Sequence, residues 1–169
     1  MAQPSGLSHV YVGAAPVTPG SLGGVFRRAV GDGGWEHLTK GLPETSHVQA
    51  ITVHPTNPDV VYVGTHGGPF RSTTRGERWE RLGFPDERAE VWSILVHPRN
   101  PDILYAGTSP TGVWRSDDGG DTWRRLPKAV QPERVKMAFP NRVIRLTADP
   151  ARPDDLYAAL EVAGVMRSL

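Results

Sequence analysis

The sequence contains no cysteine, which excludes disulfides, thiolate metal ligands and a cysteine nucleophile. It also lacks any apolar run approaching 18 residues, and its start has no basic region followed by an apolar segment, so neither a transmembrane segment nor a secretory signal is predicted. The formal net charge is only +1, and the 19 basic and 18 acidic residues are spread evenly. No basic patch for nucleic acid or for an anionic membrane is therefore expected. We expect a cytoplasmic protein.

Glycine and proline, in contrast, are abundant, with 19 Gly and 16 Pro among 169 residues. This composition favours many short elements joined by tight turns over long helices. Apolar residues make up 38% of the chain, enough to predict a folded domain with its own core.

The chain is built from a repeat of about 44 residues. Trp35, Trp79 and Trp123 are each 44 residues apart, and Arg27, Arg71 and Arg115 show the same spacing. One unit contains four β-prone runs bounded by turn residues, at 48–53, 60–63, 69–72 and 79–82. Because all connections are short, each run should pair antiparallel with the one before it.

A four-stranded unit of this length is typical of a β-propeller blade. We therefore predict an all-β chain of four-stranded antiparallel blades. The expected units are a partial blade at 8–42, complete blades at 46–85 and 90–128, and a partial blade at 141–169. Such an incomplete arc of about 3.5 blades has two explanations. Either the C-terminal half of a larger propeller is missing, or a ring is completed by self-association.

The acidic stretch SDDGGDTW, residues 116–123, invites interpretation as a catalytic or metal site, but its residue types suit a tight turn. Asp118 can accept backbone N–H groups, and Gly120 can take a positive φ. Trp123 can then pack against a neighbouring blade. We expect structural roles for these residues, for Ser116 and Thr122, and for the partial copies of the pattern, which keep Ser72, Gly76 and Trp79 in one repeat and Trp35 in another. No metal or cofactor site is expected.

Residues 116–123 fit the pattern S-x-D-x-G-x-T-W in full. With the HP-x-NPD-x-x-Y-x-GT segments, the chain resembles the BNR or Asp-box repeat propellers, a WD40/YVTN/BNR-like group of sialidase-like and sortilin-like proteins. The group is similar in repeat sequence to sialidases, xyloglucan-active glycoside hydrolases, sortilin-type receptors and a photosystem II assembly factor. The resemblance implies that the octapeptide folds a hairpin away from any active site.

Two insertions distinguish the repeats. One separates Tyr11 from Phe26, and the other separates Trp123 from Val143. Alternating strand direction places both at the same end of the blades, together with His66. Loops that vary between repeats are where an array can bind ligands. This end is the candidate ligand face, with His66, Arg134, Lys136, Phe139 and Arg142; the alternative is variation of solvated loops.

Glycoside hydrolysis needs residues that cannot be assigned here. An exo-sialidase requires an arginine triad, a tyrosine nucleophile with an acidic partner and an acid/base aspartate, and the arginine-containing R-I-P segment is absent. Xyloglucan hydrolysis requires two carboxylates facing each other across a cleft. We therefore expect a non-catalytic binding or assembly scaffold for a protein or carbohydrate ligand. The alternative is part of a glycoside hydrolase propeller.

Overall fold

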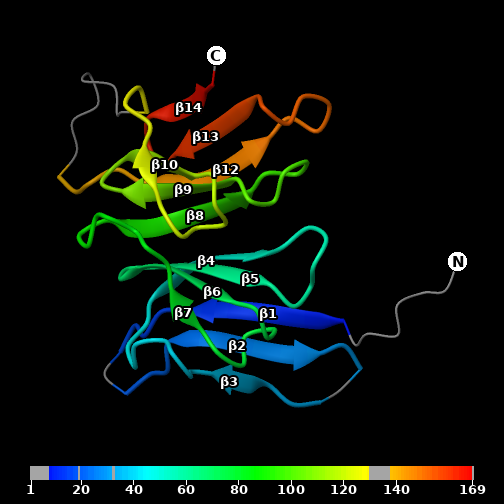
Figure 1. Ribbon diagram of the computed structural model, residues 1–169. Helices are drawn as coiled ribbons and strands as arrows, with labels where there is room; N and C mark the ends of the chain where they lie inside the picture. The colour runs from blue at the N-terminus through cyan, green and yellow to red at the C-terminus, as the bar shows by residue number, and fades with distance from the viewer. Residues whose placement is uncertain (1–7, 19, 32, 130–137, 169) are drawn as a thin grey trace, which may run out of the picture.

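The computed structural model describes residues 8–18, 20–31, 33–129 and 138–168, and in these ranges the chain forms fourteen β-strands in four sheets (Figure 1). Sheet 1 contains β1 (His9–Ala14), β2 (Gly24–Ala29) and β3 (Glu36–Leu38). Sheet 2 contains β4 (Val48–Val53), β5 (Val61–Thr65), β6 (Gly68–Ser72) and β7 (Glu80–Arg81). Sheet 3 contains β8 (Glu90–Val96), β9 (Leu104–Ser109), β10 (Gly112–Ser116) and β11 (Arg124–Arg125). Sheet 4 contains β12 (Val143–Ala148), β13 (Leu156–Leu160) and β14 (Gly164–Arg167).

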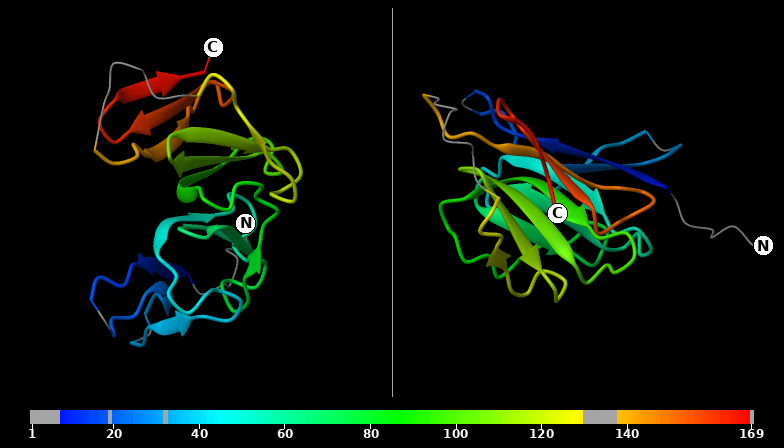
Figure 2. Two further views of the ribbon diagram at one scale, coloured as in Figure 1. Left: turned by 90° about the vertical axis from the view of Figure 1, so that its left-hand side faces the viewer. Right: turned by 90° about the horizontal axis from the view of Figure 1, so that it is seen from above.

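Every sheet is an antiparallel meander, in which strands that follow one another in sequence are hydrogen-bonded neighbours. The four sheets follow one another in a curved stack (Figure 2). The first strands of sheets 2, 3 and 4 lie next to one another, because β4 contacts β8 and β8 contacts β12. The all-β fold expected from the repeats is confirmed. The described residues contain no helix long and apolar enough to cross a membrane.

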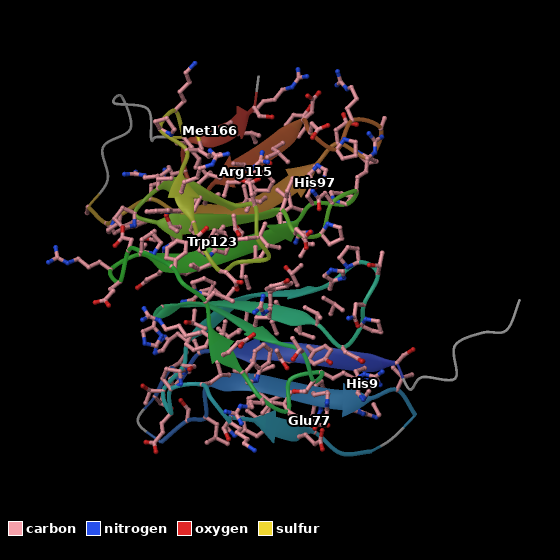
Figure 3. The ribbon with its side chains drawn as sticks, viewed as in Figure 1. His9, Glu77, His97, Arg115, Trp123 and Met166 are labelled. Atoms are coloured by element: carbon pink, nitrogen blue, oxygen red, sulfur yellow. The ribbon has the colours of Figure 1, made fainter. Side chains whose placement is uncertain are left out.

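The core lies between the sheets. Val25 and Leu38 of sheet 1 share a buried cluster with Val61 and Trp79 of sheet 2. Trp123 belongs to a second cluster, between sheets 2 and 3, with Tyr62 and Leu82 among its members (Figure 3). A third cluster joins Tyr105 and Val113 of sheet 3 to sheet 4. Each sheet therefore depends on its neighbours to bury its apolar faces, as radially stacked sheets do.

Two glycines allow the sheets to approach closely at the inner strands. A Cβ atom at Gly64 would lie 2.6 Å from the carbonyl oxygen of Val91, and one at Gly107 would lie 2.5 Å from Cγ1 of Val143. The Oγ1 of Thr52 donates a hydrogen bond to the carbonyl of Ile94 at 2.8 Å, which ties β4 to β8. The close packing therefore fixes the relative positions of the inner strands.

The outer face of sheet 1 is exposed. Val10, Val12 and Trp35 are 48%, 43% and 49% exposed. The equivalent residues of sheet 2 are Val61, Val63 and Trp79, with exposures of 0%, 0% and 3%. Trp79 packs against the preceding sheet, whereas the described residues provide no preceding sheet for Trp35. The repeat pattern therefore places a tryptophan correctly but does not determine its burial.

Candidate functional site

The turn at residues 116–123 is closed by its own side chains. Asp118 accepts two hydrogen bonds from Thr122, to Oδ1 from the backbone N–H at 2.9 Å and to Oδ2 from Oγ1 at 2.6 Å. Ser116 Oγ donates to Asp118 at 2.7 Å and accepts from the N–H of Gly120 at 2.8 Å. These hydrogen bonds, led by those from Thr122, lower the pKa of Asp118 from 3.8 to about 2. The carboxylate is engaged within the turn.

The turn at residues 72–79 repeats this arrangement with different side chains. Ser72 Oγ accepts from the N–H of Gly76 at 2.8 Å, as Ser116 does in the other turn. Thr74 stands in the place of Asp118, and its Oγ1 accepts from the N–H of Arg78 at 3.1 Å. Gly76 and Gly120 have φ values of 92° and 102°, a conformation that favours glycine.

The end of the stack where β12 begins contains a stacked arginine. The guanidinium carbon of Arg142 lies 4.1 Å from the ring centroid of Trp92 and 5.8 Å from that of Phe139. Arg142 also forms an ion pair with Glu161 at 3.2 Å, and the indole N–H of Trp92 donates to Glu90 at 3.0 Å. Two residues of the sequence-derived ligand face, Phe139 and Arg142, are thus brought together.

The other residues of that face have different outcomes. His66 contacts His47, with ring centroids 4.9 Å apart, and its Nδ1 accepts from the N–H of His47 at 3.2 Å. Among the described residues, no hydrogen bond, ion pair or ring contact joins it to Arg142 or Phe139. Arg134 and Lys136 lie outside the described residues.

A groove of about 410 Å³ runs across the inner strands β4, β8 and β12. Each strand contributes four residues: Gln49, Ala50, Ile51 and Thr52; Trp92, Ser93, Ile94 and Leu95; and Ile144, Arg145, Leu146 and Thr147. Arg145 is exposed and is the one charged residue among these twelve. The twelve include no carboxylate. Trp92 belongs both to this groove and to the arginine stack, so the two features are continuous.

The sequence did not reveal Trp92 or Arg145 as candidates. Both stand in first strands of repeats, where the pattern indicates only an ordinary strand. One signal was available, because Trp92 occupies the place of Gln49 in the preceding repeat. The difference shows that this position is not part of the repeated core pattern.

Comparison with known proteins yields structural relatives only. The sequence matches no protein-family model and no curated protein. An ancestral GH74 enzyme aligns over 99% of this chain and 22% of its own, with 20% identity and a TM-score of 0.71. The GH74 xyloglucanase from Xanthomonas campestris aligns over 98% and 28%, with 20% identity and a TM-score of 0.70. A structure of YCF48 bound to D1 peptide aligns over 89% and 43%, with 16% identity and a TM-score of 0.57.

The fold is that of part of a β-propeller. The chain spans less than half the length of each of these relatives, and the low identities extend the similarity to the fold alone. In a propeller the blades surround a central channel. The groove of β4, β8 and β12 therefore corresponds to the channel side of this propeller arc, and the Arg142 stack lies at one mouth of it.

Proposed function

We propose that this propeller segment is a non-catalytic binding scaffold whose inner groove holds a peptide through an acidic group. One observation carries the proposal: the groove has a single charged side chain, Arg145, and no carboxylate. Among the described residues the side chain of Arg145 has no hydrogen-bonding or ion-pair partner, so its guanidinium can bind a carboxylate in a bidentate manner.

The walls of the groove suit a peptide. Ile51 and Ile144 supply apolar surface, and Thr147 adds a hydroxyl. The hydroxyl of Thr52 donates to the carbonyl of Ile94, so only its acceptor capacity remains for a ligand. The accessible wall of the groove is more polar than apolar, so it can offer hydrogen bonds as well as apolar contacts to a peptide. Trp92 offers an aromatic face at one end. The structure of YCF48 with a bound peptide supports this reading, since it has a similar fold.

Hydrolysis of a glycoside is the second candidate, supported by the fold shared with GH74 enzymes. It requires two carboxylates that flank the scissile bond. Two acids that contact the arginine stack beside the groove already have partners: Glu90 accepts from Trp92, and Glu161 is paired with Arg142. The groove itself therefore supports binding better than catalysis.

We further assign Ser116, Asp118, Gly120, Thr122 and Trp123 to a structural turn of the Asp-box type, together with Ser72, Gly76 and Trp79 and the exposed Trp35. The support is the hydrogen bonding within both turns and the burial of Trp79 and Trp123 between sheets. In this assignment the acidic octapeptide takes no part in binding.

The test measures binding of fluorescently labelled peptides by polarisation, comparing aspartate- and glutamate-containing peptides with their amide counterparts. We expect the acidic peptides to bind more tightly and Arg145→Gln to weaken that binding by about tenfold or more, since a hydrogen bond to a charged group contributes about 1.5–3 kcal/mol. Arg78→Gln, at an exposed position on the 72–79 turn, is the matched control and should leave binding unchanged. The proposal would be rejected if Arg145→Gln bound the acidic peptides as tightly as the original protein does. It would also be rejected if the original protein bound xyloglucan oligosaccharides more tightly than the peptides and cleaved them.

A further inference from the structure

The contacts from sheet 1 to sheet 2 and from sheet 2 to sheet 3 follow one scheme. A tyrosine and an arginine on adjacent strands face the following sheet: Tyr11 and Arg27 on β1 and β2, and Tyr62 and Arg71 on β5 and β6. Tyr11 Oη and Arg27 Nη1 both donate to the carbonyl oxygen of Arg75, at 3.1 and 2.9 Å. Arg71 donates in the same way to the carbonyl of Gly119 at 3.0 Å, beside the buried Tyr62. Sheets 1 and 2 thus each have a donor face, and a turn carbonyl of the following sheet accepts its hydrogen bonds. The arginine of sheet 3, Arg115, bonds instead to Tyr105 and Asp117.

Among the described residues, no other sheet covers the receiving face of sheet 1, which is the face opposite its donor face. Its Val10, Val12, Phe26 and Trp35 are equivalent to Val61, Val63, Phe70 and Trp79, which the neighbouring sheet buries to 0–4% exposure. Gly31 stands at the position of Arg75, whose carbonyl accepts the two hydrogen bonds from sheet 1. The residue types of this surface are therefore those of a face that is buried in sheet 2, but in sheet 1 they are exposed to solvent.

Sheet 4 presents the matching donor face. Tyr157 occupies the place of Tyr62, and Arg167 occupies the place of Arg71, with its guanidinium carbon 5.8 Å from the Tyr157 ring centroid. Val165 is 67% exposed on β14. The arginine is anchored by Asp155 at 2.9 Å, as Arg71 is anchored by Glu80 at 2.7 Å.

Sheet 4 departs from the repeat at one position, and this departure suits contact between sheet 4 and a sheet 1. Gly64 and Gly107 let the first strand of the following sheet approach closely, but sheet 4 has Ala159 at the equivalent position. Among its described residues, sheet 1 has no strand equivalent to β4, β8 or β12. A sheet 1 placed against sheet 4 would therefore not require a glycine at residue 159.

We propose that the donor face of sheet 4 binds the receiving face of sheet 1 of a second copy of this chain, in a head-to-tail manner. Tyr157 and Arg167 of one copy then lie against Gly31 and Trp35 of the other. A head-to-tail contact closes when the rotation permits and otherwise continues as a filament. Two copies supply eight sheets, which lies within the four to eight blades of closed propellers, so the proposed assembly is a two-copy ring.

The first test is the mass in solution, measured by light scattering and sedimentation on the chain as given. We expect a single species of twice the 18.4 kDa of one chain. A folded monomer across micromolar concentrations would overturn the proposal. Open oligomers of increasing mass would also overturn it, because the ring would then not close.

Variants test which faces meet. Trp35→Arg and Val165→Arg each place a charge in one of the two faces, and each should give a monomer with an unchanged circular dichroism spectrum. Val17→Arg, at a position 87% exposed and outside the sheets, is the control and should remain dimeric. When the two variants are mixed, the unaltered sheet 4 of Trp35→Arg can bind the unaltered sheet 1 of Val165→Arg. A dimer with one chain of each variant should therefore form. Retention of the dimer by either single variant would show that another surface mediates association.

Discussion

The guanidinium of Arg71 crosses from sheet 2 to sheet 3 and donates from Nη1 to the backbone carbonyl oxygen of Gly119, 3.0 Å away. Arg27 makes the same contact one repeat earlier, with the carbonyl of Arg75 at 2.9 Å. Each arginine thus joins its own sheet to the polypeptide turn of the next. This contact gives a physical reason for an arginine that recurs in step with the tryptophans.

Replacing Arg71 with lysine should weaken the junction between sheets 2 and 3. Lysine keeps the charge but loses the planar fork that contacts Gly119, Glu80 and Asp121 together. We expect the free energy of unfolding in urea to fall by about 1–2 kcal/mol. Arg115→Lys is the control, because Arg115 bonds to Tyr105 and Asp117 of its own sheet. A loss for Arg115→Lys as large as that for Arg71→Lys would contradict the cross-sheet explanation.

Gly64→Ala should disturb the approach of sheet 3 to sheet 2. Its Cβ would lie 2.6 Å from the carbonyl oxygen of Val91, and backbone atoms cannot move aside as a flexible side chain can. We expect a loss of stability of about 1–3 kcal/mol, the usual effect of overpacking. Gly34→Ala is the control, since a Cβ there meets no atom within 4 Å. Thermal unfolding of the two variants checks the difference, and equal melting temperatures would show that the inner strands tolerate the extra methyl group.

Much of the fold could be predicted because its determinants are local. The strands follow from short β-prone runs, and the hydrogen bonds of Asp118, Ser116 and Thr122 join residues at most four positions apart. The repeat of the tryptophans then indicated stacked sheets. Short sequence patterns were sufficient for the parts of the structure that depend on contacts between residues close together in the sequence.

The candidate site was less predictable because its parts come from different repeats. Trp92 and Arg142 are 50 positions apart and meet only because sheets 3 and 4 are neighbours. Arg145 looks like any strand residue until the inner strands are placed around one groove. Trp35 matches the pattern of Trp79 but differs in burial, because burial depends on the adjacent sheet.

His54 and Asp149 should be interchangeable at the turn that follows the first strand. The Nδ1 of His54 accepts from the N–H of Asn57 at 3.0 Å, and Oδ1 of Asp149 accepts from the N–H of Arg152 at 3.0 Å. His54→Asp should therefore unfold within about 0.5 kcal/mol of the original protein, whereas His54→Ala should lose about 1 kcal/mol, the value of one hydrogen bond. Urea denaturation at neutral pH provides the comparison. If the alanine variant were as stable as the aspartate variant, the side chain would not be supporting this turn.

Asp118→Asn should change the acid dependence of stability. The hydrogen bonds from Thr122 and Ser116 lower the pKa of Asp118 from 3.8 to about 2 in the folded state. A carboxyl whose pKa is lowered by folding stabilises the fold fully at pH values above its pKa in the unfolded chain. This contribution is lost as the pH falls from about 4 through about 2. Asparagine at residue 118 cannot ionise and retains only one acceptor oxygen.

The melting temperature of Asp118→Asn should therefore lie a few degrees below that of the original protein at pH 7, and the gap should narrow as the pH falls below 4. Thr122→Val provides a graded control, because it removes the hydroxyl donor at 2.6 Å and leaves the backbone donor at 2.9 Å. Thr122→Val should lower the melting temperature at pH 7 less than Asp118→Asn does, and its effect should also diminish below pH 4. A gap that stays constant from pH 7 to pH 2 would show that the charge of Asp118 does not stabilise the turn.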